Sequence, residues 1–199
     1  MAKKFPLNHT LAREYQVLFE TCRVVPKSLP IVRVYSTTLL RHRPRYEAVS
    51  LLAPGESLLA KIPWYFIGCL HMLESGFNFN GHLHNGDPLT HCTVRIPKNH
   101  PAAGNPPFSW EDSAVDALQL KGLHKWTDWS WPGMLYQFER YNGFGYRMRG
   151  LPSPYLWSFS RHYTGGKFIA DGLFSPNAQS NQCGAGTLLS WMHKEGLLA

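Results

Sequence analysis

The chain has 199 residues, of which 44% are hydrophobic and 17% charged, a balance typical of a globular protein with a core and not of a disordered chain. Its formal net charge of +7 favours an anionic partner such as nucleic acid, a membrane surface or a cell wall. There is no Lys/Arg run of the nucleic-acid-binding type and no apolar run near the ~20 residues that cross a bilayer, so we expect neither nucleic-acid binding nor a membrane span.

The length favours a single domain, residues 1–199. The N-terminus, Met1-Ala-Lys-Lys-Phe-Pro6, lacks an apolar segment after its lysines, so we expect no signal peptide and synthesis in a cytoplasm. None of the four Cys forms a Cys-x-x-Cys pair, which argues against a zinc ribbon. Cys69 lies in an apolar helical segment and is predicted to be a small buried hydrophobe.

Helical spacing dominates the first part of the chain. Residues 9–24 carry apolar side chains at helical intervals, and Pro26 and Pro30 are expected to end that helix. Residues 36–52 form a second helical region, with Pro44 as a break or a new start. Residues 62–75 give the clearest helix, because Pro63 suits the first turn and Gly76 the position just past the end.

The next segment changes character. Residues 77–100 are rich in Asn, Gly, His and Pro, and Asn85-Gly86 is a strong turn signal. Residues 93–96 have strand character, so we predict a short β-hairpin or an irregular β-lobe over 77–100. A Pro/Gly loop follows over residues 101–107.

Three more helices are predicted in the C-terminal half. Ser109 to Asp112 resembles a capping box that opens a helix through about residue 123. Another helix runs from Trp131 to about Arg140, followed by a tight glycine-rich turn over 141–146. Residues 151–182 are expected to be loop-rich, and 183–194 form a closing helix. The predicted class is therefore α+β, mainly helical with a small β-lobe.

Glu74 is the carboxylate with the most unusual setting. It lies on the same helical face as Ile67, Leu70 and His71, in the last turn, where the negative end of the helix dipole disfavours an acid. Burial among apolar side chains raises the pKa of such an acid, which is what a glycosidase needs in a proton donor. The alternative is a helix-terminal carboxylate paired with Lys or Arg.

A glycosidase also needs a polar group that holds water or stabilises the transition state. Asp87, Thr90 and Thr93 follow Glu74 in the predicted lobe and are candidates for this role. Asp87 has an equally good interpretation as a turn residue, since Asn85-Gly86-Asp87-Pro88 is favourable turn chemistry.

Two motifs carry a family resemblance. His71-Met-Leu-Glu74-Ser-Gly-Phe-Asn78 resembles the Glu-Ser-Gly-Phe-Asn motif of goose-type lysozymes and soluble lytic transglycosylases. Glu139-Arg-Tyr141-Asn142-Gly143 is similar to the later Ala-Tyr-Asn-Ala-Gly motif of that group. Residues 82–90, 153–157 and 166–172 resemble a family of phage and bacterial lysozyme-like endolysin domains. The resemblance covers about residues 60–190.

The resemblance implies a lysozyme-like fold in one catalytic domain, with an N-terminal helical part (1–60) and a motif-bearing catalytic part (61–199). It implies a muramidase that cleaves the β-1,4 bond between N-acetylmuramic acid and N-acetylglucosamine, with Glu74 as the general acid. Its partner would be peptidoglycan, reached in the periplasm or cell wall after delivery from the host cytoplasm, and we expect a monomer. The candidate substrate contacts are His71, Tyr141, Asn142, Tyr146, Tyr155 and Trp157; apart from Tyr141 and Asn142, packing roles explain them equally well.

Other functions stay open. A lytic transglycosylase would use the same acid without water, and Arg140 and Gly143-Phe144 depart from the small residues of the second motif, which leaves hydrolase against lyase undecided. A non-catalytic wall-binding or structural phage protein is a second alternative, and a chitinase or chitosanase is a weaker relative of the first hypothesis. The histidines His71, His82, His84 and His91 invite a metal site, but they lack an ordered set of three or four ligands, so neither a metal nor another cofactor is expected.

Overall fold

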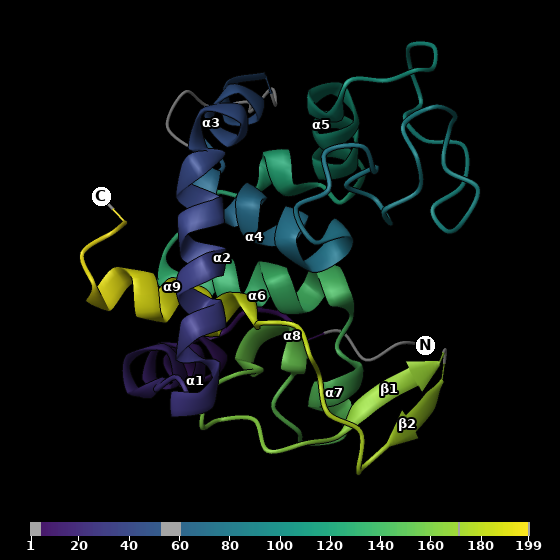
Figure 1. Ribbon diagram of the computed structural model, residues 1–199. Coiled ribbons are helices and arrows are strands. Elements are labelled where there is room, and N and C mark those ends of the chain that lie inside the picture. Colours follow the sequence, from purple (N-terminus) through teal and green to yellow (C-terminus); the bar gives the residue numbers. More distant parts are fainter. Residues whose placement is uncertain (1–4, 53–60, 171, 199) are drawn as a thin grey trace. The chain divides into compact units, whose positions relative to one another are not determined.

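The computed structural model describes residues 5–52, 61–170 and 172–198 (Figure 1). Residues 1–4 and 53–60, on which parts of the signal-peptide and N-terminal-helix predictions fall, lie outside the described residues. The chain groups into two compact units. We call Met1–Ser36 with Ser130–Ala199 the terminal unit, and Thr37–Trp129 the central unit. The single-domain prediction stays a prediction.

Helices are the main regular elements of both units. The terminal unit contains α1 (His9–Thr21), a 3₁₀ turn at Pro26–Ser28, the first part of α2 (Leu29–Arg41), α6 (Trp131–Asn142), α7 (Gly145–Met148), α8 (Pro154–Trp157), β1 (Lys167–Ala170), β2 (Leu173–Ser175) and α9 (Ala185–Lys194). The central unit contains the rest of α2, α3 (Arg43–Leu52), α4 (Trp64–Ser75), α5 (Trp110–Leu120) and a 3₁₀ turn at Leu123–Lys125.

Local sequence signals explain where several helices begin and end. The side chains of Asn8, Ser109 and Ser130 accept hydrogen bonds from backbone N–H groups of the first turns of α1, α5 and α6. Gly76 ends α4 in the left-handed region, with φ of 61°, a conformation that glycine adopts without a Cβ penalty. The predictions for α4 and α5 are therefore confirmed, as are the first and last helices.

Proline positions give one correction and one confirmation. Pro30 was expected to end the first helix. Instead α1 ends at Thr21, and Pro30 lies in the first turn of α2. Proline is tolerated there, since the first helical N–H groups have no partner inside the helix. Pro44 occupies the same place in α3, so the predicted new start is confirmed.

The predicted hairpin over 77–100 is wrong. Within the described part of that segment there is only an isolated antiparallel bridge between Gly81 and Pro88. The hairpin lies instead at β1 and β2, where Lys167 pairs with Ser175 and Phe168 with Phe174 (Figure 1). The sequence between these segments contains an Asp-Gly pair, which is a standard hairpin signal. The coarse class, α+β and mainly helical, is confirmed.

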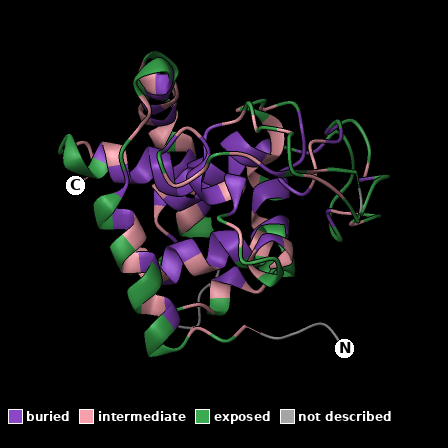
Figure 2. Ribbon diagram, turned by 90° about the horizontal axis from the view of Figure 1, so that it is seen from below, coloured by how far each residue is buried: buried purple, intermediate pink, exposed green. Residues whose placement is uncertain are grey.

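Each unit has its own core. In the central unit α3 packs against α4 and α5. Gly68 permits the close approach of α3 to α4, because a Cβ there would lie 2.8 Å from Cε2 of Tyr46. In the terminal unit α6 packs against α1, α8 and α9. Figure 2 shows buried residues running along the helices while the loops are mostly exposed. Over the described ranges, no helix has the length and apolar character needed to traverse a membrane.

Candidate functional site

Glu74 marks the point where helix α4 leaves the interior of the central unit. All residues from Phe66 to Leu73 are buried, including Cys69 as predicted, whereas Glu74 and Ser75 are partly exposed. Gly76 then turns the chain away. The Glu-Ser-Gly motif therefore presents one carboxylate at the end of an apolar helix, where a ligand can reach it.

The turn that contains Asn85 and Gly86 lies against this helix end. A Cβ on Gly86 would lie 3.2 Å from the carbonyl oxygen of Glu74, and Gly86 has a φ of 76°, so both space and conformation require glycine. The N–H of Gly86 donates to the carbonyl of His82 at 2.8 Å, and that of His82 donates to the carbonyl of Asp87 at 2.7 Å. The sequence placed this turn beside Glu74 correctly, although the strands it implied are absent from the described residues.

His71 lies one helical turn before Glu74 and is fully buried. Its Nδ1 is 3.1 Å from the hydroxyl of Tyr46, and its ring packs against those of Phe79 and Trp110 at centroid distances of 4.4 and 4.5 Å. Burial lowers the pKa of His71 to about 4, so the ring is neutral at physiological pH. These contacts make His71 a packed core residue one turn before Glu74, with no exposed ring face for a sugar.

The carboxylate of Asp87 is occupied by donors from its own loop. One oxygen accepts the backbone N–H groups of Val94 and Arg95 at 2.9 and 3.0 Å, and the other accepts Nε of Arg95 at 2.5 Å. Burial alone would raise the pKa of Asp87, but these hydrogen bonds outweigh it and lower the pKa to about 2. Asp87 is thus an ionised anchor for the loop.

The two threonine candidates differ. The hydroxyl of Thr93 is buried, donates to the carbonyl of Pro97 at 2.5 Å and accepts the N–H of His100 at 3.0 Å, so it holds the loop as Asp87 does. Thr90 is exposed. Of the three polar candidates for the second group, Thr90 alone keeps its side chain open to solvent.

A cavity of about 400 Å³ lies in the terminal unit, between the ends of α6 and α8, helix α7 and the β1–β2 hairpin. Three of the residues predicted to bind substrate, Asn142, Tyr146 and Tyr155, line it. Sequence reasoning missed its other lining groups, among them Lys167, Phe168, Ser180 and Gln182. The cavity combines aromatic rings with amide, hydroxyl and ammonium groups, which is the composition of a polar small-molecule site.

Glycines and aromatic rings fix the walls of this cavity. Gly143 has φ of 87° and ψ of 152°, a region that is essentially confined to glycine. The hydroxyl of Tyr146 accepts the N–H of Phe168 at 3.0 Å and so ties α7 to the hairpin. The guanidinium of Arg149 lies over the rings of Phe168 and Phe174 at 5.4 and 4.7 Å from their centroids.

Two further predicted contacts are placed elsewhere. Trp157 is 2% exposed and belongs to the core of the terminal unit, which leaves no ring face for a sugar. Tyr141 is partly exposed at the end of α6 but is not among the residues that line the cavity. In the motif of residues 139–143, which contains Tyr141, the Glu139 side chain is buried. Its carboxylate accepts hydrogen bonds from Nη2 of Arg147 at 2.8 Å and from the hydroxyl of Tyr15.

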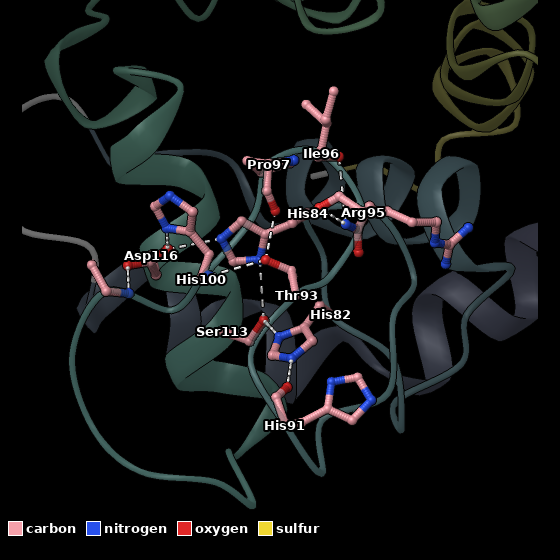
Figure 3. Close-up of polar contacts among 12 residues, drawn as sticks. His82, His84, His91, Thr93, Arg95, Ile96, Pro97, His100, Ser113 and Asp116 are labelled. Atoms are coloured by element: carbon pink, nitrogen blue, oxygen red, sulfur yellow. Dashed lines mark hydrogen bonds and ion pairs between the residues drawn. The ribbon is translucent and has the colours of Figure 1, made fainter.

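A second polar cluster lies in the central unit, around Asp116 of α5. Oδ2 of Asp116 is 2.8 Å from Nε2 of His84 and 2.7 Å from Nδ1 of His100 (Figure 3). Sequence reasoning considered His84 but missed its partners, because His100 and Asp116 are separated from it in the chain and match no spacing rule. These three side chains are of the kind that holds a metal ion.

Comparison with known proteins returned nothing: no family model, curated protein sequence or solved structure matches this chain at a significant level. The family resemblance therefore depends on the motifs quoted above.

Proposed function

We propose that this chain is a peptidoglycan-cleaving glycosidase, a muramidase of the lysozyme-like endolysin type, with Glu74 as its general acid. The observation that carries the proposal is the position of Glu74. It is a carboxylate at the accessible end of a helix whose preceding residues are buried, inside the Glu-Ser-Gly-Phe-Asn string and beside the Asn85-Gly86 turn. A lysozyme-like fold is part of the same proposal.

In the proposed reaction Glu74 donates its proton to the glycosidic oxygen as the bond from that oxygen to the anomeric carbon breaks. A water molecule then adds to the anomeric carbon from the opposite face and releases its proton to the solvent, which gives inversion. The products are one chain with a reducing-end N-acetylmuramic acid and one with a free hydroxyl on N-acetylglucosamine.

We assign two different roles to the remaining polar candidates, because some of them are bound to the loop backbone and one is exposed. Asp87 and Thr93 are bound to the loop backbone and keep the loop in place, so we assign them positioning roles. Thr90 is exposed, and we assign it to the water molecule. A retaining mechanism would need a free carboxylate near Glu74, and the Asp87 carboxylate is already occupied by three donors.

The cavity of the terminal unit is lined by side chains of the kind that bind sugars. Rings such as those of Tyr146 and Tyr155 offer apolar faces to pyranose rings, while the amide of Asn142 offers both donors and an acceptor to hydroxyl and acetamido groups. The net charge of +7 favours approach to an anionic wall polymer. The proposal keeps the expectations of a monomer that is made in a host cytoplasm and delivered to the wall.

Digestion of purified peptidoglycan, followed by mass spectrometry of the released muropeptides, tests the proposal. A muramidase releases products with reducing-end N-acetylmuramic acid, and Glu74→Gln releases none. Products lighter by one water, with a 1,6-anhydro end, identify a lytic transglycosylase. Binding to the wall without any product identifies a wall-binding or structural protein, and cleavage of chitin in place of peptidoglycan identifies the chitinase alternative. Glu111→Gln is a matched control, because this acid is also on a helix of the central unit and is held by Arg45.

A further inference from the structure

We propose that His84, His100 and Asp116 form a binding site for a zinc-class divalent metal ion that fastens the long loop of the central unit to helix α5. The site is separate from the proposed muramidase acid and does not depend on that function. Its ligand atoms would be Nε2 of His84, Nδ1 of His100 and Oδ2 of Asp116, which lie within 4.8 Å of one another.

The contacts around His84 are the first argument. Nε2 of His82 is 2.8 Å from the carbonyl of His91, and Nδ1 of His82 is 2.7 Å from the hydroxyl of Ser113. The same hydroxyl lies 3.5 Å from Nδ1 of His84, on the side of that ring away from Asp116.

Nε2 of His84 lies 2.8 Å from Oδ2 of Asp116, the oxygen that Nδ1 of His100 also approaches (Figure 3). Without an ion, an imidazole N–H donates to the carboxylate at such a distance. A metal ion would take the place of the proton between these atoms and would use the nitrogens and the oxygen as zinc ligands do.

The surroundings of the three ligands also match those of metal sites. Oδ1 of Asp116 accepts the N–H of Ala102 at 2.9 Å, which orients the carboxylate, and Ser113 orients His84. The side chain of His84 is 1% exposed, whereas those of His100 and Asp116 are 20% and 18% exposed, so the site is closed on one side and open to solvent on the other. Two imidazoles with one carboxylate favour Zn²⁺ over Mg²⁺ or Ca²⁺, and leave a coordination position for water.

The positions of the three ligands in the chain indicate a structural role for the ion. The described structure shows neither helix nor strand from Gly76 to Ser109, a length at which loops are uncommon without a function or a support. His84 lies in the first part of that loop, His100 in the last part, and Asp116 on α5. One ion would therefore fasten the loop at two points to a helix.

Isothermal titration calorimetry with Zn²⁺ at pH 7.5, on protein without a histidine tag and treated with EDTA, tests the site. We expect one equivalent bound with a dissociation constant of roughly micromolar or below. His100→Ala and Asp116→Asn should weaken binding at least about 10-fold, and Ser113→Ala, which keeps every ligand, should weaken it by about 10- to 100-fold. His91→Ala is the matched control, because His91 is an exposed histidine of the same loop and should leave the affinity unchanged.

Three further measurements on the wild type test the site even if a ligand variant fails to fold. Bound Co²⁺ in the wild type should show the visible absorption of a site with nitrogen and oxygen ligands, and saturating Zn²⁺ should raise the Tm by about 5 °C. Hydrogen exchange should slow within residues 78–108 on Zn²⁺ addition. The absence of saturable binding to the folded wild type, or equal binding by wild type, Ser113→Ala and Asp116→Asn, would overturn the proposal.

Discussion

The hydroxyl of Tyr46 lies 3.1 Å from Nδ1 of His71, inside the core of the central unit and one helical turn before Glu74. Burial removes the water that would stabilise the charged imidazole, so the pKa of His71 is lowered to about 4. The ring is therefore neutral at physiological pH. The pair connects the stability of the unit to pH.

The first prediction concerns that pH dependence. In the unfolded chain His71 takes up a proton near its ordinary pKa of 6.5, whereas the folded protein does so only near about 4. Stability contributed by the neutral ring is therefore complete above pH 6.5 and falls as the pH drops through this window, by about 2 kcal/mol between pH 6.5 and 5. Urea unfolding of wild type and His71→Gln at pH 7.5 and 5 measures it. An equal loss in both proteins would contradict the assignment.

The second prediction separates the two roles of Asp87. Asp87→Asn places an amide N–H group against the donors of Val94 or Arg95, and should reduce the free energy of unfolding by about 1–3 kcal/mol. In the wild type the benefit of the carboxylate is present above its unfolded pKa and is lost as the pH falls toward about 2. Thr90→Ala, at an exposed position, is the control for stability. If folded Asp87→Asn loses as much muramidase activity as Glu74→Gln, Asp87 is a catalytic group and not an anchor.

The third prediction concerns the buried ion pair of the terminal unit. Glu139 is 2% exposed and receives Arg147 at 2.8 Å, while the same guanidinium reaches the exposed Glu14 at 3.0 Å. Arg147→Met removes the counter-ion of a buried carboxylate and should cost about 3–5 kcal/mol. Glu14→Gln removes only the surface partner and should cost less than about 1 kcal/mol. Similar losses in thermal unfolding of the two variants would show that Glu139 does not require its partner.

The fourth prediction concerns Gly184, the residue before α9. A Cβ at this position would lie 2.4 Å from the backbone carbonyl of Leu156, so Gly184→Ala must displace α8 or α9. We expect a loss of about 1–3 kcal/mol in chemical denaturation, the usual cost of overpacking. Gly145→Ala is the graded comparison, because its Cβ would meet only the ring of Phe168 at 3.2 Å, and a side chain can move. A larger loss for Gly145→Ala than for Gly184→Ala would refute this explanation.

The sequence predicted the elements whose signals are local. The end of α4 at Gly76, the cap of α5 at Ser109 and the new start at Pro44 follow from chemistry within a few residues, and all three are confirmed. The hairpin of β1 and β2 was missed because its strands are short and largely exposed, with little hydrophobic alternation.

The candidate sites also separate into residues found from local motifs and contacts that depend on the folded structure. Glu74 was found from its motif, and its catalytic role stays a prediction. The expected burial among apolar side chains is not observed, because Glu74 is partly exposed at the end of α4. Asp87 was considered for catalysis because a sequence cannot show that Val94 and Arg95 donate to its carboxylate. The partnership of His84 with Asp116 arises from folding of a long irregular loop onto α5, which no spacing rule anticipates.

The most direct measurement of the central claim is the rate at which purified peptidoglycan releases reducing ends with wild type, Glu74→Gln and the control Glu111→Gln, each confirmed to be folded by circular dichroism. A general acid contributes about 10²- to 10⁴-fold, so Glu74→Gln should fall by at least that factor while Glu111→Gln stays near wild type. Turnover by Glu74→Gln at the wild-type rate would contradict the account and remove Glu74 from the mechanism.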